Sequence, residues 1–192
     1  MSVWKDFGSA EDQQTFDIIP RGTIARVRMT IKPGGYNDPD QGWTGGYATL
    51  GDTGAVYLNC EFVITEGPFA RRKVWSLIGL HSPKGPTYAN MGRSLIKGIL
   101  NSARGFSTKD DSSQAMAARR INGIGDLDGI EFTARIDIEK DRNGDDKNVI
   151  KTAVTKDHKD FGKSGGNGGG STPPVQTPPA AAPAANLPSW AR

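Results

Sequence analysis

The 192-residue sequence contains a single cysteine and no long run of apolar residues. One thiol, Cys60, excludes an intrachain disulfide framework and leaves no paired-thiol metal site, which favours a reducing compartment and a core position for this residue. No stretch approaches the roughly 20 apolar residues that span a bilayer, and the N-terminus carries no signal-peptide core. These absences predict a cytoplasmic protein with no membrane partner.

Motifs of catalysis are also missing. The only histidines, His81 and His158, lie in segments without metal-ligand spacing, and no phosphate-binding Gly-Lys-Thr loop, nucleophile elbow or zinc pattern occurs. Residues 141–145 lack the liganding positions and the terminal glutamate of a calcium loop. The sequence therefore predicts a protein that is not an enzyme and that uses no metal or cofactor.

Charge is modest in total and uneven along the chain. The net charge is +3, well below the cationic excess of a protein that binds DNA by charge alone. Residues 55–104, however, carry about +5, whereas residues 1–54 carry about −2. Three consecutive cations in this region stand between Phe69 and Trp75. Positive charge beside flat rings is typical of proteins that bind nucleic-acid strands.

The C-terminal segment differs in composition from the rest of the chain. From Ser164 onward it consists mostly of Gly, Pro, Ala, Ser and Thr, which bury too little apolar surface to offset the entropy of ordering. We therefore predict a globular domain over residues 1–160 and a disordered tail over residues 161–192. Apolar side chains return at the tip of the tail, where we expect a partner-binding motif formed by Leu187, Pro188 and Trp190.

Alternation of apolar and polar residues predicts five β-strands in the domain. They span residues 23–31, 55–65, 72–80, 129–139 and 147–155. Helical spacing of apolar residues predicts an amphipathic helix over residues 88–104, and an Ala- and Arg-rich run predicts a shorter one over 110–121, capped by Asp110 or Asp111. The predicted fold class is mainly β: a five-stranded OB-fold-like barrel with a helical insert between strands 3 and 4, plus a disordered C-terminal tail.

Residues 34–47 separate the first two predicted strands and hold three aromatic rings among glycines and prolines. We expect a long loop here. Either it closes over a ligand, as the corresponding loop of OB-folds commonly does, or it is a mobile loop of no fixed role.

Three segments resemble a known family. FDIIPRGT at residues 16–23, EGPFARRKVW at 66–75 and GIEFTARI at 129–136 resemble early proteins of tailed bacteriophages, some of which are OB-fold single-stranded-DNA-binding proteins. The resemblance covers residues 14–155. It implies a partner, single-stranded DNA, and a tail tip that recruits replication or recombination proteins. The tail departs from the usual acidic pattern of such proteins, because its last residue is Arg192.

Proteins that bind single-stranded nucleic acid of any sequence place cations along the phosphates and stack aromatic rings on the bases. For phosphate contact we predict the cations of the expected β-strands and of the hairpin: Arg26, Arg28, Arg71, Arg72, Lys73 and Arg135. For stacking we predict the rings in the same segments: Trp43, Tyr47, Tyr57, Phe69 and Trp75.

Each candidate also has a structural explanation. Trp75 lies on a strand and fits the core as well as the outer surface, and Tyr57 fits packing against a neighbouring strand. Arg71 and Arg72 fit a role as solvated charges that protect a sheet edge. Arg135 stands between Glu131 and Glu139 on one strand face, where an ion-pair ladder is an alternative to DNA contact.

Two hypotheses about function follow. The first is a phage-encoded protein that coats single-stranded DNA in replication or recombination. The second is a protein-interaction module that binds and modulates a host or phage enzyme. A monomer and a homodimer are both compatible with either hypothesis.

Overall fold

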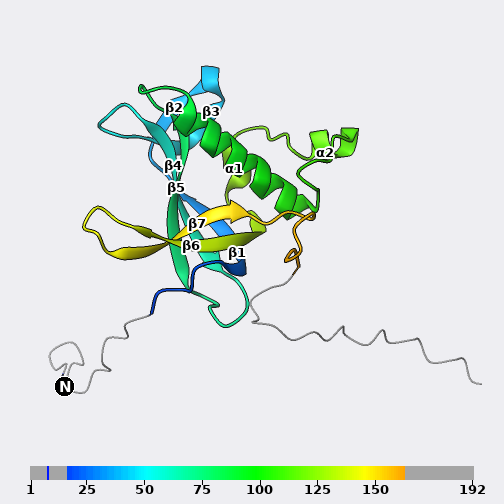
Figure 1. The fold of residues 1–192 in the computed structure, drawn as a ribbon. Helices are drawn as coiled ribbons and strands as arrows, with labels where there is room; N and C mark the ends of the chain where they lie inside the picture. Colours follow the sequence, from blue (N-terminus) through cyan, green and yellow to red (C-terminus); the bar gives the residue numbers. More distant parts are fainter. Residues whose placement is uncertain (1–7, 9–16, 163–192) are drawn as a thin grey trace, which may run out of the picture.

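The centre of the structure is the ten-residue strand β1 (Thr23–Lys32). The computed structural model of the protein describes residues 8 and 17–162 (Figure 1). The inward side chains of β1, from Ala25 to Ile31, are buried, because successive residues of a strand point to opposite faces. β1 pairs antiparallel with β4 (Val56–Ile64) along its C-terminal half and with β6 (Glu131–Lys140) along its N-terminal half. One strand therefore joins the two halves of the sheet.

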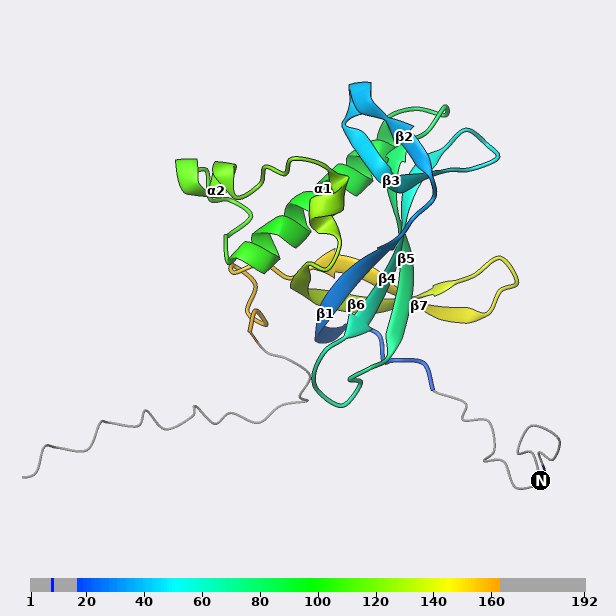
Figure 2. The same cartoon turned by 180° about the vertical axis from the view of Figure 1, so that it is seen from behind.

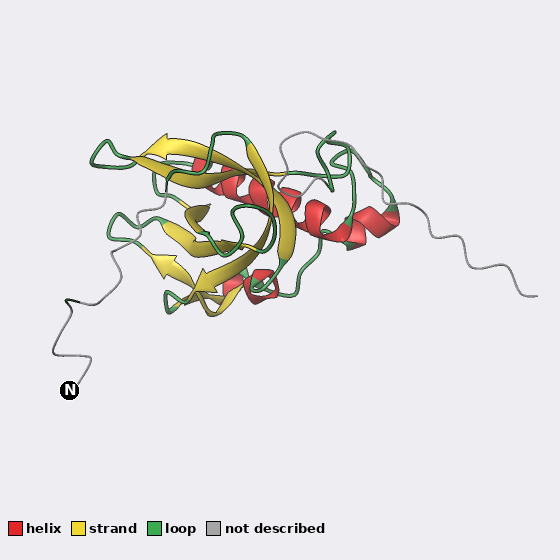
Figure 3. Cartoon of the chain, turned by 90° about the horizontal axis from the view of Figure 1, so that it is seen from below, coloured by secondary structure: helices red, strands yellow, loops and turns green. Residues whose placement is uncertain are grey.

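Two further strands extend the sheet on either side of this centre. β5 (Lys73–His81) pairs with β4, and β7 (Asp146–Ala153) pairs with β6. The sheet curls around the core (Figure 3), and across the seam the backbone N–H of Ile150 donates to Ser76 Oγ at 3.0 Å. No backbone ladder joins β5 to β7 in the described part of the chain. The architecture is therefore a curled, mainly antiparallel half-barrel.

One long helix, α1 (Thr87–Arg104), packs on the sheet (Figure 2). Its buried Ile99 and Leu100 join the core, in which Phe62 and Phe132 meet edge to face with ring centroids 6.0 Å apart. Ser102 Oγ of the helix accepts a hydrogen bond from the backbone N–H of Thr133 in β6. The predicted helix over 88–104 is thus confirmed.

The second predicted helix is much shorter than expected. Only α2 (Ser113–Ala117) is helical in the segment 110–121, and its cap is Ser112, whose hydroxyl accepts from the N–H of Ala115. Asp110 instead accepts from the backbone N–H of Ser112. The predicted aspartate cap was therefore wrong by one to two residues.

The expected count of five strands is too low. All five predicted strands are present, but the sheet has seven strands in the described region, because β2 (Tyr36–Asp38) and β3 (Trp43–Leu50) occupy the segment expected to be a loop. In chain order α1 consequently follows the fifth strand. A single 3-10 turn, η1 (Pro39–Gln41), joins β2 to β3.

Local contacts explain the two additional strands. The Asn37 side chain accepts a hydrogen bond from the N–H of Gly46 at 2.8 Å, and Gly35 donates to the carbonyl of Gly46. Gly46 adopts a φ of 70°, which an L-residue rarely adopts. Glycine lowers the expected strand propensity of the segment, although here it makes the tight pairing possible.

The described residues contain no helix that is both long and apolar enough to cross a membrane. Cys60 is fully buried in β4, as predicted, and this burial, followed by the nearby Asp128, raises the pKa of its thiol to about 12. The thiol is therefore a packing group. The predicted tail lies outside the described residues, apart from residues 161 and 162.

Helix α1 rests directly on β5 at a pair of glycines. A Cβ added at Gly92 would lie 1.8 Å from the carbonyl oxygen of Gly79, and a Cβ at Gly79 would lie 2.6 Å from the ring of Tyr88. Both distances are far shorter than a normal carbon contact. Neither position therefore accommodates a side chain without movement of the helix.

Gly92→Ala is expected to lower the free energy of unfolding by about 1–3 kcal/mol, because the new methyl group forces α1 away from β5. Gly98→Ala is the matched control. Its methyl would meet Ala153 Cβ at 3.4 Å, and alanine favours a helix over glycine by about 1 kcal/mol. Chemical unfolding measures both variants, and equal stability of the two would contradict the close helix–strand contact.

Candidate nucleic-acid interface

The outward side chains of β1, β4 and β5 form one continuous surface, which we call the sheet face. Cross-strand register places these side chains in three rows. The rows are Arg28–Val63–Lys73, Thr30–Glu61–Trp75 and Lys32–Asn59–Leu77. Arg26 continues the outward side of β1 beyond the first row. The face thus combines four cations with an aromatic and an aliphatic side chain.

Glu61 lies at the middle of the sheet face, between two lysines. Its carboxylate is 3.1 Å from the Nζ of Lys73 and 3.5 Å from that of Lys32, and only 11% of its side chain is exposed. The hydrogen bond from Lys73, with Lys32 adding to it, holds the pKa of Glu61 below its ordinary value against the opposing effect of desolvation. Both lysine side chains remain about half exposed.

Glu131 of β6 forms the corresponding ion pairs with two arginines of β1. Arg28 donates to its carboxylate at 2.5 Å and 2.9 Å, and Arg26 donates at 3.2 Å. These hydrogen bonds, that of Arg28 first, lower the pKa of Glu131. Four cations held by two carboxylates leave an excess of two positive charges on the sheet face.

Trp75 points outward from β5. It is 54% exposed, as is Leu77 two residues further along the strand. The alternative of a core position for Trp75 is therefore wrong. Trp75 follows Lys73 by two residues on the same side of β5 and lies opposite Glu61. A tryptophan with half of its surface in solvent is able to stack on a base.

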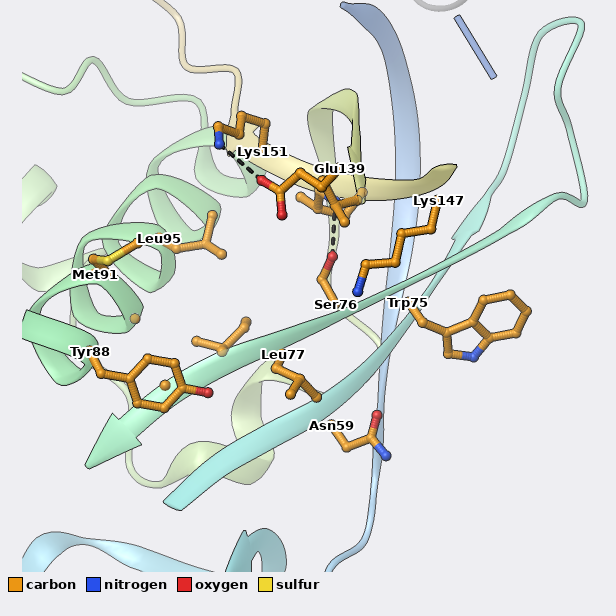
Figure 4. A pocket seen from close by; sticks show the side chains of 15 residues that line it. Asn59, Trp75, Ser76, Leu77, Tyr88, Met91, Leu95, Glu139, Lys147 and Lys151 are labelled. Carbon is orange, nitrogen blue, oxygen red and sulfur yellow. Dashed lines mark hydrogen bonds and ion pairs between the residues drawn. The ribbon is translucent and has the colours of Figure 1, made fainter. Parts of the chain in front are cut away.

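A groove of about 570 Å³ adjoins the sheet face at the seam between β5, β7 and α1 (Figure 4). Leu77 and Tyr88 form part of its wall, and Met91 of α1 is 67% exposed there. Figure 4 shows Trp75 at the end of the groove opposite to Tyr88 and Met91. Burial, with a contribution from nearby Tyr57, raises the pKa of Tyr88, so its hydroxyl is neutral and able to donate a hydrogen bond.

The predicted cluster on the β4–β5 hairpin is divided among three environments. Arg72 lies over the ring of the half-buried Phe69, 5.8 Å from its centroid, and donates to the carbonyl of Asp17 at 2.5 Å. Arg71 is exposed at the hairpin with a φ of 71°. Lys73 belongs to the sheet face. Arg72 and Phe69 therefore hold the N-terminal segment and the hairpin together, while Arg71 and Lys73 are accessible.

Two of the predicted stacking residues lie elsewhere. Trp43 and Tyr47 of β3 are half-buried and pack against the core. The Tyr47 ring lies so close to the 3-10 turn η2 (Ile124–Leu127) that a Cβ at Gly125 would be 2.7 Å from it. The structure thus places these two rings at the contact of β3 with η2, and Trp43 also lines a second cleft.

Tyr57 and Arg135 lie at the margins of the sheet face. Tyr57 is half-buried in β4, opposite Thr49 of β3 and Gly79 of β5. Arg135 is exposed on β6 and lies opposite Ile24 of β1, two residues before Arg26. The alternative ion-pair ladder through Arg135 is not formed, because Glu131 pairs with the β1 arginines and Glu139 pairs with Lys151.

The sequence-based selection missed several residues of the sheet face and the groove. Lys32 continues the outward alternation of Arg26 and Arg28, so the period of two would have identified it. Lys147 lines the groove from β7, but no signal in the sequence links it to β5, since the two strands are distant along the chain.

The described residues contain no group of three or more His, Cys, Asp or Glu side chains that is arranged to hold a metal ion. No family model matches the chain, and no curated protein matches its sequence. The resemblance to phage early proteins therefore stays a prediction. The expected partner-binding residues Leu187, Pro188 and Trp190 lie outside the described residues.

The pKa of Glu61 predicts how stability depends on pH. A carboxyl with a folded-state pKa below its ordinary value stabilises the fold above that ordinary value, and the contribution is lost as the pH falls through the folded-state pKa. Glu61→Gln is therefore expected to be less stable than the wild type at pH 7, and the difference is expected to disappear in acid.

Chemical unfolding between about pH 7 and about pH 3 measures this difference. Glu139→Gln is the matched control, because that carboxylate is 49% exposed and has one lysine partner. A stability gap for Glu61→Gln that persists unchanged in acid, or one no larger than that of the control at neutral pH, would contradict the role of the Glu61 pair.

Proposed function

We propose that the protein binds single-stranded DNA across the sheet face without sequence preference and acts in phage DNA replication or recombination. The observation that carries the proposal is the half-exposed Trp75 ring on a face whose cations are ordered by Glu61 and Glu131. Such a surface supplies both interactions that unpaired strands require, namely backbone neutralisation and base stacking.

The order of the strands supports this proposal. With the β2–β3 hairpin set aside, β1, β4, β5, α1, β6 and β7 follow the chain order of an OB-fold, with the helix between the third and fourth of these strands. The sheet pairs β1 with β4 and β6, as such a barrel requires. We interpret the domain as an OB-fold-like barrel with an inserted hairpin, a fold that binds oligonucleotides on the corresponding face.

The spacing of the charges also supports single-stranded DNA as the ligand. β1 and β5 lie on either side of β4, so their outward side chains are about 10 Å apart. Phosphate contacts to the cations of these two strands leave Trp75, between Lys73 and Leu77 on the outer side of β5, for a base. Bases are accessible to Trp75 only when they are unpaired, which favours single-stranded over double-stranded DNA.

Oligo-dT is expected to bind and to quench tryptophan fluorescence, and Trp75→Ala is expected to weaken binding by about tenfold or more, since each stack contributes roughly 1–3 kcal/mol. Leu50→Ala is the matched control, because Leu50 is a similarly exposed apolar residue on β3. Fluorescence anisotropy of labelled oligo-dT gives both affinities. A flat titration of the wild type at low salt would refute the proposal, and equal loss in the two variants would move the stacking site away from Trp75.

Salt dependence tests the phosphate contacts separately. Affinity is expected to fall steeply as salt rises, and the double variant Arg71→Gln, Lys73→Gln is expected to reduce the slope of log affinity against log salt by about 0.7 for each lost contact. The double variant Lys97→Gln, Lys156→Gln removes two exposed lysines outside the sheet face and controls for net charge. If the control lowers the slope equally, the binding surface is not the one proposed.

A further inference from the structure

A second cleft, of about 730 Å³, lies between η1, the N-terminal half of α1 and residues 121–124. We call it the η1–α1 cleft. Figures 1 and 2 both show the β2–β3 hairpin beside the N-terminal end of α1. Residues from both of these parts line the cleft. It shares no lining residue with the groove between β5 and β7. The two concave surfaces are therefore separate sites.

The floor of the η1–α1 cleft is apolar and contains a fixed aromatic ring. Trp43 lies at the start of β3, opposite Asp38, whose side chain caps η1 by accepting from the N–H of Gln41. Gly42 ends the turn at a φ of 77° and sets the direction in which β3 begins. Trp43 is half-buried beside Leu80 in the lining of the cleft. Its ring packs against the core and is therefore held in place before any ligand arrives.

The rim of the cleft is polar. Ser82 Oγ accepts a hydrogen bond from the N–H of Lys84. Five further polar side chains line the cleft: Gln41, His81, Asn90, Arg93 and Asn122. Within the described part of the chain none of these side chains forms a hydrogen bond or an ion pair. No carboxylate lines the cleft, and Arg93 is its one arginine or lysine. On the sheet face, by contrast, Glu61 and Glu131 form ion pairs with the cations.

We infer that the η1–α1 cleft binds one nucleotide, with the base against Trp43 and the phosphate at Arg93. An apolar pocket of this size with a few free polar groups has the composition of a small-molecule site. Amide side chains present a donor and an acceptor together, which matches the edge of a base. An arginine without a carboxylate partner matches a phosphate. The shared chemistry, a base with its phosphate, comes either from a free nucleotide or from a nucleotide of a bound strand.

AMP, adenosine and a short oligo-dA are the probes, and the NMR signal of the Trp43 indole N–H, assigned with Trp43→Phe, is the readout. AMP is expected to shift this signal saturably. Arg93→Gln is expected to weaken AMP binding about tenfold, the loss of one charge-assisted hydrogen bond, and to leave adenosine binding unchanged. Lys97→Gln, one turn further along α1 and outside the cleft, is the matched control and is expected to bind AMP as the wild type does.

The outcomes distinguish a free nucleotide from a nucleotide of a bound strand. They are also independent of binding at the sheet face, which is followed separately by the indole N–H signal of Trp75. A Trp43 shift with AMP identifies a free nucleotide as a ligand. A shift with oligo-dA alone, reduced by Arg93→Gln, identifies a nucleotide of a bound strand. If neither probe shifts the Trp43 signal, or if Arg93→Gln and Lys97→Gln respond equally, the inference is overturned, whatever happens at Trp75.

Discussion

The arrangement of the sheet face depends on two carboxylates that each lie between two cations. Glu61 holds Lys32 and Lys73 across three strands, and Glu131 holds Arg26 and Arg28 from the neighbouring strand β6. Without them, the four like charges on β1 and β5 would repel one another and spread into solvent. The ion pairs hold the four cationic side chains in place with little desolvation, since each of these side chains remains about half exposed. In the proposed binding, a phosphate is expected to meet donors already in place and to compete with a carboxylate for each of them.

The fold was largely predictable because burial imposes a period of two on every strand. Ile31 and Phe62 each belong to a series of apolar residues that alternates along its strand and is buried in the core. This alternation located the strands with small errors at their ends. The β2–β3 hairpin was not predictable in this way. It depends on one side chain, that of Asn37, and on glycines whose left-handed conformations permit the pairing. Those features indicate a loop in the sequence and form a hairpin only in three dimensions.

The candidate site was predictable where it follows a single strand and not where strands meet. Alternation identified the outward arginines of β1, and Trp75 was found as a candidate although alternation did not fix its direction. The roles of Glu61 and Lys147 were not predictable, because each depends on a neighbour that is distant in sequence. Arg72 was misleading for the opposite reason. Its charge indicated ligand contact, whereas the fold uses it to hold Phe69 and the carbonyl of Asp17.

The sheet face and the η1–α1 cleft differ in the kind of recognition that their side chains permit. Asn59 is the one amide in the three rows of the sheet face, and both of its arginines are engaged by Glu131, so this face has few groups that distinguish one base from another. Three free amides line the η1–α1 cleft. Charge and base stacking do not distinguish sequences, whereas amide side chains can distinguish base edges. In the proposed binding we therefore expect a preference for one base to arise at the cleft around Trp43 and not at Trp75.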